Sequence, residues 1–351
     1  MVSLPAPTKA RAGRTSSGPR PRPRASRLVP ALFLAAGVLA LAALLSVSVG
    51  TQYVPFDQVV RALIHPGTSY DDTVVQSRVP RTILGLLAGA ALSIAGVIMQ
   101  GLTRNPLGDP GLLGVNTGAA AAVVSGIAFF GVSSDQQQVW LSLVGALIAV
   151  VAVYALGSGR RGATPVRLVL AGAVITAVLS AYIQAITLTN PNAFADYRFW
   201  VVGSLAGRDP GLILQVLPYL VIGFVLALLL PSSLNALALG DDTATALGAK
   251  VGRTRILGAV ASALLCAAAT ASVGPIAFIG LAVPHIVRTF TGADHRWLMP
   301  FSALLGPALL LLADVLGRIV ASPQELQVGV VTAFLGAPVL LFAVRRMRGI
   351  E

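Results

Sequence analysis

Ionisable side chains within apolar stretches are the first candidates for chemistry in this sequence, because they are costly to place in a membrane interior. Asp314 and Arg318 lie four residues apart in the apolar run 298–320. On a helix this spacing puts them on one face, where they can neutralise each other. A proton relay needs further ionisable groups, and the central run 166–189 carries only Arg167, at its start. The pattern therefore favours a structural ion pair over a relay.

Motifs for catalysis, nucleotide binding or metal binding are absent from the sequence. The segment nearest to a G-x-x-x-x-G-K-[ST] phosphate loop is 248–252 (GAKVG), with the wrong spacing and no hydroxyl after the lysine. His65, His285 and His295 lie far apart, and the one cysteine, Cys266, is expected to be a small buried apolar residue. We expect no catalytic residue, cofactor or metal site, so a separate chain must supply any ATP hydrolysis.

The composition indicates that lipid is the natural solvent for most of the chain. Charged residues make up 11% of the 351 residues, and the mean hydropathy is +0.82, whereas a soluble domain carries about 25% charged residues. The apolar runs are too long for the alternating strands of a barrel. We expect an all-α, polytopic membrane protein of about ten transmembrane helices, packed closely through small residues such as those in 85–96. The predicted spans are 28–49, 83–103, 112–132, 139–157, 166–189, 211–231, 254–273, 275–291, 298–320 and 326–344.

The basic residues predict how these spans are oriented, because cytoplasmic loops carry an excess of Lys and Arg. With the N-terminus in the cytoplasm, 19 of the 25 basic residues fall on the cytoplasmic side. An even number of spans then places both termini in the cytoplasm. This distribution accounts for the net charge of +12 without a nucleic-acid partner. The six basic residues left outside are Arg61, Arg78, Arg81, Arg198, Arg208 and Arg318.

The chain divides into a tail and one membrane domain. Residues 1–27 are rich in Arg, Pro and Ser with no acidic residue, and are expected to form a disordered cytoplasmic tail, while 28–346 form the domain of ten helices. The outer loop 51–79 contains a short amphipathic pattern. The inner loop 232–253 is expected to hold one or two short helices, with acidic residues at a helix N-terminus and Gly248 as a C-terminal cap.

Four long motifs, in this order along the chain, resemble those of the FecCD permease family, whose members serve iron-siderophore, haem and vitamin B12 importers. The resemblance covers roughly residues 30–346. The motifs are 78–82 (RVPRT), 100–115 (QGLTRNPLGDPGLLGV), 274–288 (GPIAFIGLAVPHIVR) and 329–338 (GVVTAFLGAP).

The resemblance implies the permease fold of a type II ABC importer in a bacterial plasma membrane. Two permease subunits, as a homodimer or a heterodimer, would enclose the pathway within membrane lipid. Two ATPase subunits would bind on the cytoplasmic side and an extracytoplasmic substrate-binding protein on the other. The motifs do not distinguish among siderophores, haem and cobalamin. A ferric siderophore is expected because it is the commonest cargo of the family.

The resemblance also assigns roles to individual residues. Arg78, Arg81 and Arg318 match arginines that meet acidic residues of the binding protein; the alternatives are anchoring to lipid headgroups for the first two and pairing with Asp314 for Arg318. A cytoplasmic gate is expected at Asn105 and Leu107 and, by a looser match, at Thr164 and Pro165, although Pro106 and Pro110 also simply end a helix. The expected ATPase-coupling segment, with an ordinary connecting loop as the alternative, comprises Leu239, Gly240, Asp241, Asp242, Ala244, Ala246, Leu247 and Gly248.

Two other function classes remain open from the residues alone. A proton-coupled secondary transporter or an exporter needs the same spans, and a membrane-embedded enzyme would need a catalytic constellation, which the sequence lacks. Uptake that survives ATP depletion but collapses with the proton gradient would favour the secondary transporter.

Overall fold

The computed structural model describes residues 25–65, 67–159 and 162–348. Residues 1–24 of the predicted tail, 1–27, are outside the described part of the chain, so the tail stays a prediction. The all-helical prediction is confirmed, with one two-stranded ribbon added, in which β1 pairs antiparallel with β2. The elements are α1 (Ala25–Ser48), α2 (Phe56–Ile64), α3 (Tyr70–Thr103), η1 (Pro110–Leu113), α4 (Val115–Phe130), α5 (Asp135–Gly157), β1 (Ser158–Gly159), β2 (Gly162–Ala163), α6 (Pro165–Thr189), α7 (Pro191–Trp200), α8 (Gly211–Leu228), α9 (Pro231–Leu237), α10 (Asp241–Ala246), α11 (Val251–Val273), α12 (Ile279–Thr291), α13 (His295–Val320) and α14 (Val328–Arg348).

Each of the ten predicted spans corresponds to one of the longer helices: α1, α3, α4, α5, α6, α8, α11, α12, α13 and α14. In the described part of the chain, seven of them are long and apolar enough by themselves to cross a membrane: α1, α3, α5, α6, α8, α11 and α13. The chain is therefore a polytopic helical membrane protein. α4 and α12 are shorter, with 16 and 13 residues.

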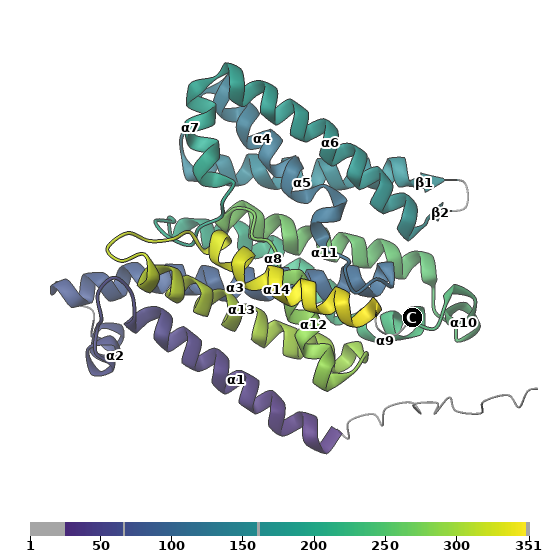
Figure 1. The fold of residues 1–351 in the computed structure, drawn as a ribbon, viewed down its shortest axis with the longest axis horizontal. Helices are drawn as coiled ribbons and strands as arrows, with labels where there is room; N and C mark the ends of the chain where they lie inside the picture. Colours follow the sequence, from purple (N-terminus) through teal and green to yellow (C-terminus); the bar gives the residue numbers. More distant parts are fainter. Residues whose placement is uncertain (1–24, 66, 160–161, 349–351) are drawn as a thin grey trace, which may run out of the picture.

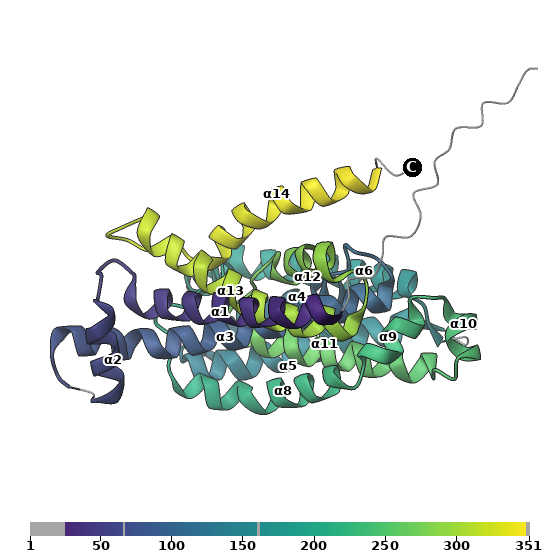
Figure 2. The ribbon, with the colours of Figure 1, turned by 90° about the horizontal axis from the view of Figure 1, so that it is seen from below.

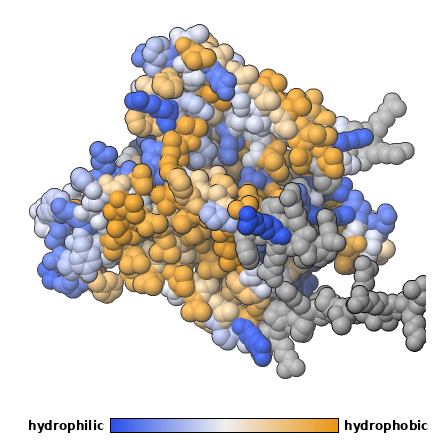
Figure 3. Space-filling view, viewed as in Figure 1, coloured by the Kyte–Doolittle hydropathy of each residue, from blue (hydrophilic) through white to orange (hydrophobic). Residues whose placement is uncertain are grey.

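The long helices run between two ends of the molecule (Figure 1). One end, here the α2 end, carries α2, α7 and the loop from α13 to α14. The other, the α10 end, carries the ribbon, α9 and α10, and the start of α1 and the close of α14 lie toward it. Apolar side chains cover the middle of the face seen in Figure 3, and polar ones gather toward both ends, as a membrane-spanning body requires.

Helix α3 is the centre of the larger of two groups of helices. It packs against α1, α11, α12 and α13. Helices α4 to α7 form a second group beside it (Figure 1), joined to the first mainly where α5 and α4 contact α11. Helix α14 contacts α12 and α13 and stands away from the other helices over its C-terminal half (Figure 2).

Small residues let α3 approach its neighbours, since helices in lipid gain little from the hydrophobic effect and associate through close packing. A Cβ on Gly89 would lie 2.6 Å from the backbone nitrogen of Pro307 in α13, and one on Gly96 would collide with the carbonyl of Gly280 in α12. At the first crossing, Ser93 Oγ donates a hydrogen bond to the Ser302 carbonyl at 2.7 Å.

Apart from the start of α3, the predicted span boundaries lie within four residues of the helix ends, and two of the differences have a clear local cause. The second span was expected to begin at residue 83, but α3 begins at Tyr70 because Ser69 and Asp72 form a capping box. The span expected at 275–291 forms a helix only from Ile279, since Phe278 has a positive φ of 70°. The loop 232–253 forms two short helices as expected, and Gly248 follows α10 in a left-handed conformation with a φ of 83°.

Candidate transport sites at the two ends of the bundle

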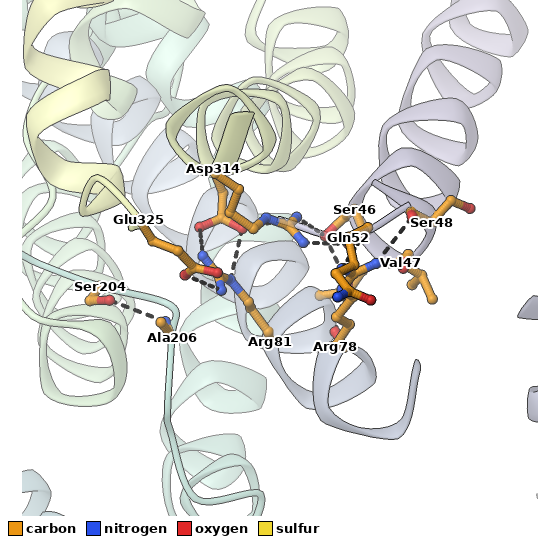
Figure 4. A network of polar contacts seen from close by, with 12 residues as sticks. Ser46, Val47, Ser48, Gln52, Arg78, Arg81, Ser204, Ala206, Asp314 and Glu325 are labelled. Carbon is orange, nitrogen blue, oxygen red and sulfur yellow. Dashed lines mark hydrogen bonds and ion pairs between the residues drawn. The ribbon is translucent and has the colours of Figure 1, made fainter. Parts of the chain in front are cut away.

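The three arginines expected to dock a binding protein lie together at the α2 end: Figure 4 labels Arg78 and Arg81, and Arg318 pairs with Asp314 of the same network. Arg78 and Arg81 are on α3 and Arg318 is on α13, beside the last turn of α1. Because α3 begins before residue 78, Arg78 and Arg81 both lie within this helix. They are three residues apart and so share one face of it. The structure thus brings all three residues to one site.

Arg81 binds two carboxylates at once. Its Nε and Nη2 donate to the two oxygens of Asp314 at 2.9 and 2.8 Å, and its Nη1 donates to Glu325 at 2.7 Å. Asp314 is 1% exposed and also lies 3.2 Å from Arg318 Nη2, so the ion pair expected at this spacing is present. A buried carboxylate needs such partners because its desolvation costs several kcal/mol. Arg81 thereby joins α3 to α13 and to the loop before α14.

Arg78 binds the backbone at the end of α1. Its Nη1 donates to the carbonyls of Val47 and Ser48 at 2.9 and 3.0 Å, and its Nη2 donates to Gln52 at 2.7 Å. The last carbonyls of a helix have no partner within it, and a cation at that end is also favoured by the helix dipole. The buried Arg78 side chain therefore fixes where α1 ends.

Arg318 binds the same turn of α1 from the other side. Its Nη1 donates to the Ser46 carbonyl at 2.9 Å, and the Ser46 hydroxyl lies 2.8 Å from that of Thr82. Arg318 is 1% exposed. The guanidinium groups of Arg78, Arg81 and Arg318 are thus all engaged within the chain, and their docking role stays a prediction.

At the α10 end, the loop that follows α3 is held by its own hydrogen bonds. Asn105 Oδ1 accepts from the Leu107 amide at 2.9 Å, and the Asn105 carbonyl accepts from Gly108. Asp109 caps η1 by accepting from the Gly111 amide at 2.7 Å. Leu107 lines a small cavity with residues of α12 and α14. The hydrogen bonds within the loop therefore make it a compact unit that packs against neighbouring segments.

The second expected gate segment lies at the same end of the molecule. Thr164 is the N-cap residue of α6 and Pro165 its first residue, where a missing N–H costs nothing. The start of α6 reaches the loop region, because Leu168 and Val169 line a cavity together with Thr103 and Leu112. The gate role of both segments stays a prediction.

Burial raises the pKa of Asp109, because a carboxyl out of water favours its neutral form, and the hydrogen bond from Gly111 only partly opposes this. Asp109 is the only acidic residue of the loop 104–109. The loop thus contains a group whose charged form is disfavoured.

The expected coupling segment forms α10 and its flanks. Ala244 is fully buried, so it packs inward and is not part of the surface that a partner would meet. The exposed members are Leu239 (63%), Asp242, Ala246, Leu247 (66%) and Gly248. The segment therefore presents two exposed leucines at the α10 end.

Asp241, the first residue of α10, binds two arginines from different helices. Its Oδ1 pairs with Arg104, the residue that follows α3, and its Oδ2 lies 2.8 Å from Arg255 Nη2 in α11. The sequence predicts neither arginine as a partner of Asp241, since Arg104 is 137 residues away and Arg255 lies 14 residues away on another helix. The sequence feature that points to these arginines is the excess of basic residues predicted on this side of the membrane, and it does not identify their partner.

Known proteins similar to this chain are membrane permeases. A model of the FecCD transport family matches residues 38–346. The chain is 50% identical over 320 residues to the ferric enterobactin transport system permease protein FepD of Escherichia coli (strain K12), covering 91% of this chain and 95% of that protein. It is 38% identical over 308 residues to the Fe(3+)-citrate import system permease protein YfmD of Bacillus subtilis (strain 168), covering 88% and 92%.

One solved structure is similar along nearly the whole fold. It is described as an ABC transporter of the metal-chelate type in an inward-facing conformation. The two chains superpose with a TM-score of 0.79 and 28% sequence identity, covering 91% of this chain and 99% of that one.

Proposed function

The chain belongs to the FecCD transport family, as its motifs predicted, and from this premise we propose that it imports ferric siderophores across a bacterial plasma membrane as one subunit of an ATP-driven complex. It is a transport permease and not an enzyme. The observation that carries the substrate class is the 50% identity, over 91% of the chain, to a ferric enterobactin permease. The iron in such a chelate is already bound by its own ligands. The translocation pathway must therefore be wide enough for the chelate, and it does not need residues that bind the iron tightly.

The energy for transport comes, in this proposal, from two ATPase subunits that bind at the α10 end. The exposed Leu239 and Leu247 offer apolar contacts there, and a small helix such as α10 can enter a groove on a partner. A second permease subunit, identical or related, completes the pathway. The α10 end then faces the cytoplasm, as the excess of basic residues on that side favours.

The substrate-binding protein docks, in this proposal, at the α2 end. The network there contains three guanidinium groups, of Arg78, Arg81 and Arg318, and two carboxylates, of Asp314 and Glu325, so it carries one excess positive charge. An acidic surface of a partner is attracted to such a cluster. Arg78 and Arg318 are buried, so they act on a partner only through the positive electrostatic potential of the cluster and by holding the end of α1 in place. Arg81 pairs with the exposed Glu325 and so lies closest to the surface that a partner would meet.

Uptake of a panel of iron-labelled chelates tests this function. Cells that lack the chain and cells that carry it are compared with ferric catecholate, ferric hydroxamate, ferric citrate, haem and cobalamin. We expect uptake of a ferric siderophore to depend on the chain. Dependence of haem or cobalamin uptake alone would contradict the substrate class but leave the family membership intact.

A further inference from the structure

The carboxylate of Asp241 joins three segments that are far apart in the sequence. Asp241 opens α10, Arg104 follows α3, and Arg255 lies near the start of α11. One carboxylate between two guanidinium groups holds all three segments at one point. The side chain is 43% exposed, so the junction lies at the surface of the α10 end and is not part of the buried core.

Helix α10 is otherwise attached to the body by little. It has six residues, of which Ala244 is the buried one, and it contacts α9 and α11. Gly240 and Gly248 flank it at positive φ, with nothing within 4 Å of the place where a side chain would begin. A force on α10 therefore reaches the rest of the chain mainly through its ends and through Asp241.

Arg104 passes such a force to a compact loop. It is itself in the left-handed conformation with a φ of 50°, directly before the hydrogen-bonded turn of Asn105 to Gly108. Leu107 in that turn lines the cavity against α12 and α14. A displacement of Arg104 must therefore move the loop as a whole.

We propose that Asp241 is a positioning residue that ties α10 to the loop after α3, so that a displacement of α10 moves that loop. The inference rests on the proposed function, in which α10 is the segment that an ATPase subunit displaces. It assigns to Asp241 a contact within the permease, and not a contact with the ATPase. The link to Arg255 holds α11 in the same unit.

Asp242 provides a matched control for Asp241. Both acidic residues lie in the first turn of α10, where the helix dipole favours a negative charge. Among the described residues, Asp242 makes no ion pair or side-chain hydrogen bond, whereas Asp241 makes two ion pairs. Any difference between the two asparagine variants therefore reports the pairing with Arg104 and Arg255.

The first test uses the full complex in proteoliposomes, with ferric siderophore uptake and ATP hydrolysis measured together. Asp241→Asn is expected to keep complex assembly and ATP hydrolysis but to lower the chelate transported per ATP by about two- to fivefold, the range set by exposed ion pairs. Asp242→Asn lies in the same coupling segment but lacks these ion pairs, so it is the reference for any direct effect of α10 on the ATPase, and Asp241→Asn is expected to transport less chelate per ATP than this reference. An unchanged ratio in Asp241→Asn, or loss of the ATPase from its complex, would overturn the proposal.

A covalent tie gives a second, positive test. Cys266 is buried, so cysteines placed by Arg104→Cys and Asp241→Cys can be joined selectively with a short bifunctional thiol reagent. If the two positions move together, joining them restores the transport ratio that each single variant loses. Transport blocked by the link would show that they separate during the cycle, and would overturn the proposal. A wild-type complex that hydrolyses ATP without moving any chelate would instead contradict the proposed function.

Discussion

Arg81 and Asp314 form two parallel hydrogen bonds, of 2.9 and 2.8 Å, between α3 and α13. The residues are 233 positions apart in the sequence, and the carboxylate is almost fully buried. Two parallel bonds fix orientation as well as distance, which a single contact does not. The pair therefore sets how the two helices meet at the α2 end, where Arg318 and Glu325 complete the network.

Replacing Asp314 by asparagine is expected to destabilise the protein strongly. Arg81 and Arg318 would lose their buried counter-charge, and breaking such a pair by removing one partner costs about 3–5 kcal/mol. Thermal unfolding of the purified chain in detergent measures the effect as a lowered melting temperature. The exposed Asp196→Asn is the control and should leave it unchanged; equal melting temperatures for both variants would contradict the structural role of the pair.

Removing the charge of Glu325 tests docking at the α2 end without disturbing the buried pair. Glu325 holds Arg81 through one oxygen and its side chain is 33% exposed, so Glu325→Gln leaves Arg81 on Asp314 and increases the net positive charge. Affinity for the binding protein is expected to rise about two- to fivefold at low salt, where exposed charges are least screened. Affinity that stays the same or falls would count against a docking role for Arg81.

An exposed leucine near α10 tests where the ATPase binds. Leu247→Glu places a charge on the expected apolar contact, and we expect loss of ATPase binding in pull-down while the chain still inserts in the membrane. Leu63→Glu, at an exposed leucine of the α2 end, is the control. Ala244→Arg is less informative, since Ala244 is buried and the variant would disturb α10 itself. Normal ATPase binding by Leu247→Glu would refute this contact.

The Asp109 carboxyl predicts a pH dependence in the loop after α3. Its pKa is raised in the folded protein, so its contribution to stability is fully present below the unfolded pKa and is lost as pH rises through the folded value. Asp109→Asn keeps the acceptor for Gly111 but cannot titrate. The wild type should therefore gain stability relative to this variant as pH falls from about 8 to about 4. Melting temperatures across that range check the sign, and a relative gain toward high pH would contradict it.

The sequence predicts the spans well because apolar length is a local property. The same holds for α10, which begins at Asp241, where the helix dipole favours an acidic residue, and is followed by Gly248 in the left-handed conformation. The start of α3 was missed by 13 residues, because its first turns are polar and carry no hydropathy signal, while the capping box at Ser69 decides where the helix begins.

The partners of the charged residues could not be predicted in the same way. Glu325 is 244 positions from Arg81, and Arg104 is 137 from Asp241. No spacing rule connects such residues, since their contact depends on how α3, α13 and α10 pack. The pair that the sequence does predict, Asp314 with Arg318, is four residues apart on one helix, where the spacing alone brings the side chains together.

Transport by the reconstituted complex tests the central claim most directly. The chain, its sister permease if one is needed, the ATPase and the binding protein are placed in proteoliposomes with ATP on the ATPase side, and uptake of an iron-labelled siderophore is followed. The account predicts uptake that needs hydrolysable ATP and persists when a proton uncoupler is added, with no ATP hydrolysis by the isolated chain. Uptake that proceeds without ATP and collapses with the proton gradient would contradict it.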